Sequence, residues 1–149
     1  MGELIGSQLS EEVWSRFQEA PNLVALVASA GESGPDVAPV SLVHVASRSR
    51  ILLGLAHDRR TLANVIAGSP VAVSLILVPD IALTVLGPAR VLRHRMQAAE
   101  HVAAVELTAH TVKDDRHPDT EITAQLAYRW TDPVRHAVDV ALLRELRSL

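Results

Sequence analysis

The chain has 149 residues, 48% of them hydrophobic and 21% charged, with a net charge of −3 and no cysteine. This length suits a single domain, residues 1–149, with its own hydrophobic core. The lack of cysteine excludes disulfides, thiolate metal sites and cysteine nucleophiles, and the charge balance argues against a nucleic-acid partner. No signal-peptide pattern opens the sequence, and Pro79 and Asp80 interrupt its longest apolar stretch. We therefore expect a cytoplasmic protein without a membrane partner.

The first half of the chain predicts one helix followed by three strands. A helix over residues 9–20 has Ser10 as its N-cap, and acidic residues occupy the positive end of its dipole. Residues 22–30, 36–47 and 51–56 are rich in valine, leucine and isoleucine and are separated by turn sequences. Their short connections predict an antiparallel meander.

A short helix over residues 59–67 comes next, with Gly68 at its C-terminal end. Residues 71–78 and 80–93 predict a fourth and a fifth strand, and Gly87-Pro88 indicates a bend within the fifth.

The last third of the chain predicts two further strands and a long helix. Residues 94–102 suit a short helical connection, and residues 103–114 a sixth strand. Apolar residues alternate over 122–130, which is a seventh-strand or broken-strand pattern. Asp132 and Pro133 are suited to begin a helix over 131–149. These elements indicate a mainly β fold, a six- to seven-stranded antiparallel barrel with peripheral helices.

Two adjacent arginines, Arg59 and Arg60, lie where the short helix begins. Cations at the positive end of a helix dipole are unfavourable by about 0.3–1 kcal/mol each. One interpretation is that both are solvated and that Asp58 compensates one of them. The other is that they bind an anion, most plausibly phosphate, together with the Thr61 hydroxyl and the first backbone N–H groups.

Other catalytic signatures are absent from the sequence. It has no glycine-rich phosphate loop, no dinucleotide fingerprint, no HExxH and no nucleophile elbow. The seven histidines are scattered without ligand spacing, so we expect no metal site. The sequence identifies no catalytic residue.

Three short motifs carry a family resemblance through their order and spacing. They are Gly34-Pro35 leading to Pro39-Val40, Thr61 to Val65 leading to Pro70 to Val73, and Gly87 to Val91. In this order the chain resembles the pyridoxamine 5′-phosphate oxidase-like, flavin-binding split β-barrels. The resemblance covers roughly residues 9–93 and continues more weakly to the last helix.

The resemblance implies a homodimer of split barrels with two flavin mononucleotides (FMN) at the interface. The ring would lie against the second and third strands and the phosphate at the helix start, with a deazaflavin as an alternative cofactor. Trp130 would contact the ring across the dimer, or would simply cover the barrel end. The implied cofactor-binding residues are Pro39, Val40, Ser41, Leu55, His57, Arg59, Arg60, Thr61 and Trp130.

Departures from the family pattern bear on function. Thr61 stands where the family often has a lysine, and Ala38 and Val43 stand at or near positions where the oxidase itself has an arginine and a lysine. Pyridoxamine-phosphate oxidase activity itself is therefore not expected. The leading hypothesis is a flavin-dependent oxidoreductase of unknown small-molecule substrate. The alternative is a non-catalytic protein of the same fold that binds flavin, deazaflavin or haem, or has lost its cofactor.

Overall fold

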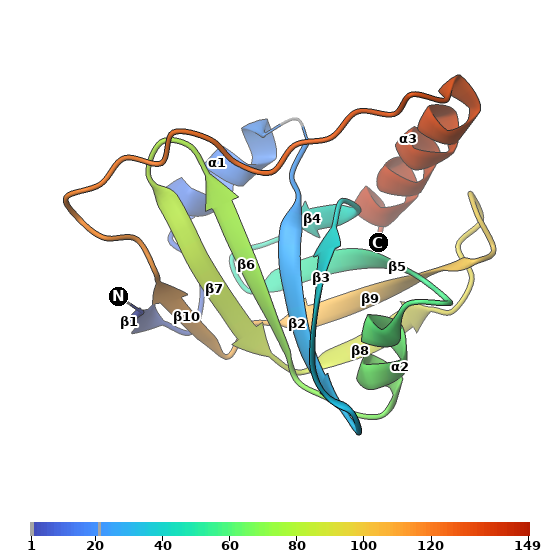
Figure 1. Ribbon diagram of the computed structural model, residues 1–149, viewed down its shortest axis with the longest axis horizontal. Coiled ribbons are helices and arrows are strands. Elements are labelled where there is room, and N and C mark those ends of the chain that lie inside the picture. The colour runs from blue at the N-terminus through green and yellow to red at the C-terminus, as the bar shows by residue number, and fades with distance from the viewer. Residues whose placement is uncertain (1, 21) are drawn as a thin grey trace.

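The computed structural model describes residues 2–20 and 22–149. Within these residues three helices surround two antiparallel sheets (Figure 1). The helices are α1 (Glu11–Glu19), α2 (Arg60–Ile66) and α3 (Pro133–Arg147). The strands are β1 (Glu3–Gly6), β2 (Ala25–Gly31), β3 (Gly34–Val40), β4 (Val43–Val45), β5 (Arg50–Ala56), β6 (Val71–Leu77), β7 (Ile81–Gly87), β8 (Ala89–Arg93), β9 (Val102–Thr108) and β10 (Thr111–Asp114). No helix in this part of the chain is long and apolar enough to span a membrane.

The two sheets face each other across one core. The larger has the strand order β1-β10-β7-β6-β2-β3 and the smaller β4-β5-β9-β8. Apolar residues from both sheets join in a single buried cluster, to which α1 and α2 also contribute. A mainly β, barrel-like fold with peripheral helices is thus confirmed.

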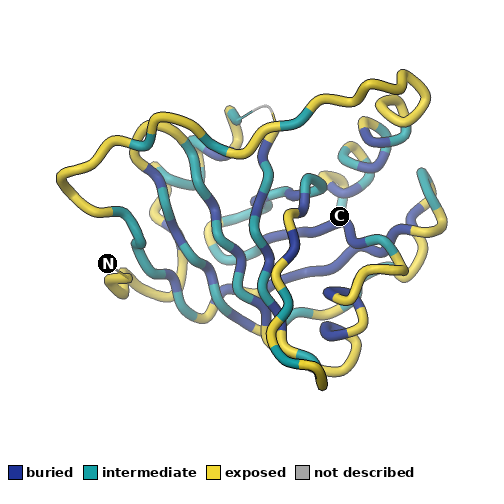
Figure 2. The backbone as a smooth tube through the Cα atoms, in the orientation of Figure 1, coloured by how far each residue is buried: buried dark blue, intermediate teal, exposed yellow. Residues whose placement is uncertain are grey.

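Strands of the smaller sheet are buried on both faces where α3 packs against them, whereas β6 and β7 are buried on one face. Strands β6 and β7 alternate between buried and half-buried residues, because only one of their faces meets the core. Strands β5 and β9 are instead buried along nearly their whole length (Figure 2). Leu52 and Ala104, on the face away from the main core, pack against Leu142 and Leu146 of α3. The last helix therefore covers the outer face of the smaller sheet.

Three predicted strands are each divided between the two sheets. Residues 36–47 form β3 in the larger sheet and β4 in the smaller, with Ser41 and Leu42 at the crossing. The expected antiparallel pairing of consecutive strands is confirmed, because β2 pairs with β3 and β4 pairs with β5. The meander is nevertheless divided between the two sheets, because the chain changes sheet after Val40. Residues 80–93 divide into β7 and β8, and residues 103–114 into β9 and β10.

The predicted bend at Gly87-Pro88 is confirmed, and the structure explains why glycine stands there. The Thr108 amide donates to the Pro88 carbonyl (3.0 Å), and the His110 amide to the Leu86 carbonyl (2.8 Å). A Cβ on Gly87 would lie 1.8 Å from the Thr108 carbonyl oxygen. The two backbones can approach this closely only without a side chain.

Two sequence predictions fail in the second half of the chain. In addition, a strand near the N-terminus was missed. Residues 94–102 form no helix, because Glu145 of α3 accepts hydrogen bonds from the Gln97 and Ala98 amides (3.0 and 2.8 Å) and holds the segment as a loop. Strand β1, which pairs with β10, was not predicted.

The other failure is the expected seventh strand. Residues 116–131, here called the C-terminal strap, form no strand and run along one end of the larger sheet from β10 to α3 (Figure 1). The Ile122 amide donates to the Pro79 carbonyl (2.7 Å), and the Gln125 side chain accepts from the Val78 amide (2.8 Å). Both edges of β7 are already paired, with β6 and β10, so the strap has no edge there to join.

The other three predicted helices are confirmed, with the capping residues that were expected at their ends. The Ser10 hydroxyl accepts from the Val13 amide at the start of α1 (3.1 Å). The Asp132 carboxylate accepts from the Val134 amide (2.9 Å) before α3, and Pro133 is its first residue. Gly68 has a φ of +93° just beyond the end of α2, as suits a glycine there.

Candidate functional site

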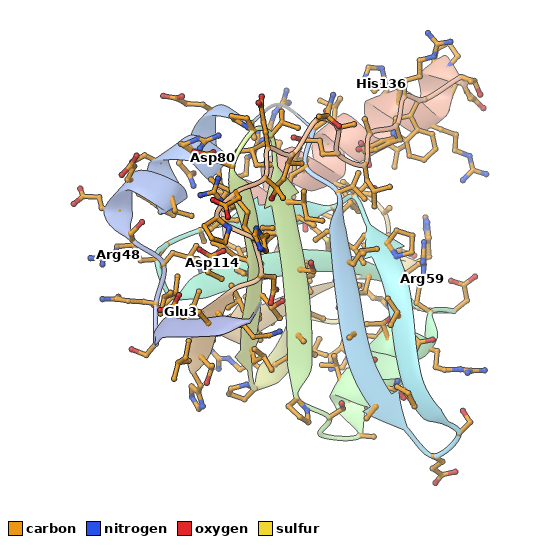
Figure 3. The ribbon with its side chains drawn as sticks, turned by 60° about the vertical axis from the view of Figure 1, so that its left-hand side comes forward. Glu3, Arg48, Arg59, Asp80, Asp114 and His136 are labelled. Atoms are coloured by element: carbon orange, nitrogen blue, oxygen red, sulfur yellow. The ribbon has the colours of Figure 1, made fainter. Side chains whose placement is uncertain are left out.

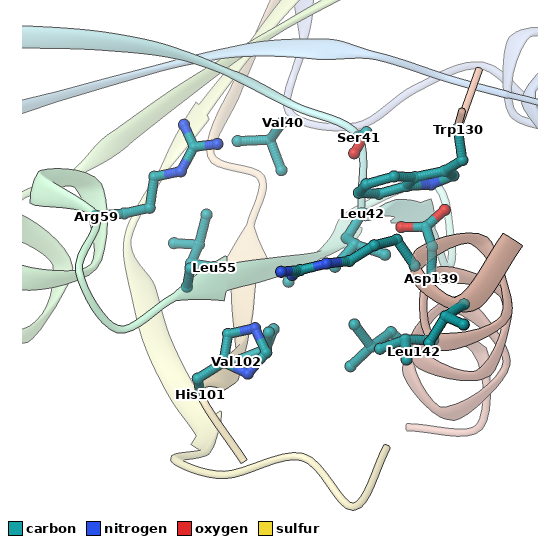
Figure 4. Close-up of a pocket in the computed structure, with 15 residues that line it drawn as sticks. Val40, Ser41, Leu42, Leu55, Arg59, His101, Val102, Trp130, Asp139 and Leu142 are labelled. Carbon is teal, nitrogen blue, oxygen red and sulfur yellow. The ribbon is translucent and has the colours of Figure 1, made fainter. Parts of the chain in front are cut away.

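A cleft of about 450 Å³ lies between the end of β5 and the N-terminal half of α3 (Figure 4). Its β-side wall comes from the β3–β4 crossing, the end of β5, the start of α2 and the start of β9. Its other wall comes from α3 and the end of the C-terminal strap. The lining residues are Val40, Ser41, Leu42, Gly54, Leu55, Ala56, Arg59, His101, Val102, Trp130, Val134, Arg135, Val138, Asp139 and Leu142.

Packing at the far end of α3 creates the cleft. Leu142 and Leu146 are buried against Leu52 and Met96, and Arg50 donates to the Leu149 carbonyl (3.2 Å). In the first turn of α3, Val134 is 73% exposed and does not belong to this cluster. The space between this part of the helix and β5 therefore stays open.

The narrow β-side wall depends on Gly54 of β5. Its amide donates to the Leu42 carbonyl (2.8 Å), and a Cβ at this position would lie 2.8 Å from the Leu42 side chain. Glycine thus allows the β3–β4 crossing to lie directly on β5. Leu55 is 1% exposed and belongs mainly to the core, so it offers the cleft little surface.

Arg59 supplies positive charge at one end of the cleft. It is the N-cap of α2, and its amide closes a turn onto the Ala56 carbonyl (3.0 Å) at the end of β5. The guanidinium of Arg59 lies near Val40 (Figure 4). Figure 3 shows Arg59 beside β3, on the other side of the molecule from Arg48 and Asp80. His101 also lines the cleft and precedes β9.

The other end of the cleft holds two aromatic residues and a buried carboxylate. Trp130 is 42% exposed and meets Tyr128 edge-to-face, with ring centroids 6.2 Å apart. The Tyr128 hydroxyl donates to Asp139 Oδ2 (3.1 Å). Burial and the Asp139 carboxylate raise the pKa of Tyr128, so the phenol keeps its proton and remains a donor at neutral pH.

The structure brings together five of the nine predicted cofactor-binding residues: Val40, Ser41, Leu55, Arg59 and Trp130. The remaining four lie outside the lining of the cleft.

Those four residues have other surroundings. Pro39 is exposed and Arg60 projects into solvent at the start of α2. His57 Nε2 lies 2.6 Å from the His94 carbonyl oxygen. Thr61 is 1% exposed, and its hydroxyl donates to Asp36 Oδ2 (3.2 Å). The Thr61 hydroxyl is therefore engaged by the β2–β3 hairpin.

Sequence reasoning missed the contribution of α3. Arg135 and Asp139 line the cleft together with Val138 and Leu142. The apolar stripe of this helix was apparent, but not which strand it covers. A carboxylate directly after Val138 of that stripe was the signal for Asp139.

A second, more polar pocket of about 330 Å³ lies between α1, β4 and the end of α3. His44 and Arg147 both line it. Burial, and then the positive charges of Arg147 and Arg50, lower the pKa of His44. This imidazole is therefore neutral at physiological pH. The described residues contain no group of three side chains arranged to hold a metal ion.

Known proteins resemble this chain in structure but not in sequence. The sequence matches no family model and no curated protein. Solved structures do match it. A candidate pyridoxamine 5′-phosphate oxidase from Lactobacillus delbrueckii is 21% identical, with a TM-score of 0.60 over 75% of this chain and 98% of that one.

Two other similar structures are named for different cofactors. A haem storage protein from Vibrio cholerae is 12% identical, with a TM-score of 0.53 over 70% of this chain and 95% of that one. A flavocytochrome from Azotobacter vinelandii is 13% identical, with a TM-score of 0.54 over 83% of each chain. The chain thus has the fold expected from the resemblance, that of the pyridoxamine 5′-phosphate oxidase-like proteins.

Proposed function

We propose that this protein binds flavin mononucleotide in the cleft between β5 and α3 and acts as a flavin-dependent oxidoreductase on a small molecule. The observation that carries the proposal is a largely apolar cleft with the Arg59 guanidinium at one end and the Trp130 indole at the other. A flat aromatic ring requires apolar walls, and a phosphate monoester requires a cation. A deazaflavin fits the same description.

Different residues would contact the phosphate and the ring of the flavin. Arg59 would pair with the phosphate, and Arg60, its neighbour in the chain, would add positive charge. Val40 and Val102 would flank the ring, and Trp130 would shield it from water. The bound flavin would supply hydride transfer. Because Asp36 already accepts from the Thr61 hydroxyl, the main phosphate contact falls to Arg59.

Flavin binding is tested by the absorption spectrum of the purified protein and by titration of FMN. The Arg59→Ala variant should bind FMN more weakly by about 1.5–3 kcal/mol, the range for a hydrogen bond to a charged group. Arg60→Ala should weaken it less, and Arg144→Ala, which removes an exposed arginine outside the cleft, should leave it unchanged. A colourless protein that does not retain added FMN would refute the proposal. Oxidation of a nicotinamide by the flavin-loaded protein then tests turnover.

Haem is the second candidate ligand, favoured by His101 in the cleft wall. An imidazole there can serve as an axial ligand to haem iron. Added hemin would then give a Soret band that shifts in the His101→Ala variant. FMN titration of the same preparations separates the two candidates.

A homodimer with the flavin at its interface is part of the proposal. Leu126, Trp130 and Val134 are large apolar residues that remain exposed around the strap and the start of α3. Trp130 and Val134 both line the cleft, and exposed apolar side chains grouped in this way are typical of protein interfaces. A partner subunit seated there would cover the mouth of the cleft.

A further inference from the structure

Asp139 is a buried carboxylate in the wall of the cleft that α3 supplies. It is 9% exposed and lies between Leu142 and the Trp130 indole (Figure 4). Among the described residues, its hydrogen-bond donor is the Tyr128 hydroxyl, which reaches Oδ2. Burying a carboxylate is costly unless its oxygens are hydrogen-bonded. The second oxygen, Oδ1, remains available as an acceptor at the cleft.

Arg135 lies one helical turn before Asp139 and lines the same cleft. Residues four apart on a helix share a face, so the two side chains present opposite hydrogen-bonding roles from the same face of α3. The carboxylate only accepts, and the guanidinium only donates. Arg59 lies at the opposite end of the cleft.

A flavin ring carries the complementary pattern on its pyrimidine edge, where one N–H group stands between two carbonyl oxygens. We infer that α3 recognises this edge: Asp139 accepts from the ring N3–H, and Arg135 donates to an adjacent carbonyl. This inference rests on the proposed function. It also fixes the direction of the ligand, with the phosphate at Arg59 and the pyrimidine edge at α3. A porphyrin has no such edge, and its carboxylates would be repelled by Asp139.

The test compares FMN with its N3-methyl analogue, which cannot donate from N3. The wild-type protein should bind FMN about tenfold or more tightly than the analogue, the scale of a hydrogen bond to a charged group. The Asp139→Leu variant keeps the side-chain shape but has no acceptor, so it should bind both ligands alike and FMN about tenfold more weakly. Tyr128→Phe, which leaves the carboxylate in place, is the matched control and should still discriminate.

Each outcome has a distinct meaning. If the wild-type protein binds FMN and its N3-methyl analogue equally, the inference is wrong while the proposed function stands. The same holds if Asp139→Leu discriminates as the wild type does. Circular dichroism shows whether Asp139→Leu folds. If it does not, the inference is tested by the wild-type protein and by Asp139→Asn, which should discriminate between FMN and its N3-methyl analogue less than the wild type does. If the wild-type protein binds no FMN, the proposed function fails and this inference with it.

Discussion

Glu106 of β9 joins three strands of the smaller sheet through one carboxylate. Arg50 of β5 donates to one of its oxygens and Arg90 of β8 to the other. Burial disfavours the charged form, but the hydrogen bonds from the two arginines outweigh it, so the pKa of Glu106 lies below its ordinary value. A group whose pKa is lowered by folding stabilises the protein above its unfolded pKa, and this stability is lost as the pH falls through the folded pKa.

Replacing Glu106 by glutamine should therefore destabilise the protein in a pH-dependent way. At pH 7 we expect a loss of about 1.5–3 kcal/mol, as for hydrogen bonds to a charged group. The difference from wild type should narrow as the pH is lowered. Urea unfolding across this pH range measures it, with Glu100→Gln at an exposed glutamate as the control. A loss that does not change with pH would contradict the assignment.

Gly87 is the second residue whose role is specific enough to test. A methyl group there would collide with the Thr108 carbonyl oxygen at the bend between the sheets. The Gly87→Ala variant should lose about 3 kcal/mol, the upper end of the usual cost of overpacking. Gly34→Ala measures a backbone cost without a collision, because Gly34 has a φ of +106° and no atom within 4 Å of the added Cβ. Equal melting temperatures for Gly87→Ala and wild type would rule out this role.

Among the secondary-structure elements, α3 links stability to the proposed binding site. Its N-cap, Asp132, accepts from the amides of Val134 and Arg135, two residues that line the cleft. Asp132→Ala should lower stability by about 1 kcal/mol and should also weaken FMN binding, because the first turn frays. Ser10→Ala removes the equivalent cap of α1. It should give a similar loss of stability with FMN affinity unchanged. If Ser10→Ala also bound FMN more weakly, the effect of Asp132→Ala on FMN binding would come from lower overall stability and not from the first turn of α3.

The predicted and observed elements differ where pairing with distant strands determines whether a segment forms a strand. Residues 71–78 and 80–93 were predicted as strands and contain β6 and β7, whose burial has a period of two. Residues 122–130 alternate in the same way, yet their partly buried residues, Ile122, Gln125 and Tyr128, recur every third position. A local pattern cannot reveal that β10 already occupies the edge of β7. Capping residues were more reliable, since Ser10 and Asp132 act through neighbours in sequence.

For the whole molecule, the candidate site was only partly predictable. Arg59 stood out because its charge is unfavourable at a helix start, and Val40 and Ser41 followed from the family resemblance. Arg135 and Asp139 contribute from the other end of the chain, and only the folded structure places α3 over β5. The roles of these residues remain predictions until FMN binding is measured.

The proposed homodimer is tested by light scattering. At micromolar concentration the protein should have twice the 16.1 kDa mass of the chain. Val134→Glu places a charge on a residue that is 73% exposed at the cleft mouth and should favour the monomer. Val37→Glu changes another exposed valine, on β3 and outside the cleft, and should leave the mass unchanged. A wild-type mass of 16.1 kDa would count against the dimer.

Glu145 has a consequence for how the cleft can adapt to its ligand. Its carboxylate accepts from the Arg93 side chain and from the amides of Gln97 and Ala98, so the loop before His101 is tied to α3. Any shift of the helix that widens the cleft must pull this loop with it or break these hydrogen bonds. The helix and the loop should therefore move together, and a ligand thick enough to displace α3 would displace this loop at the same time.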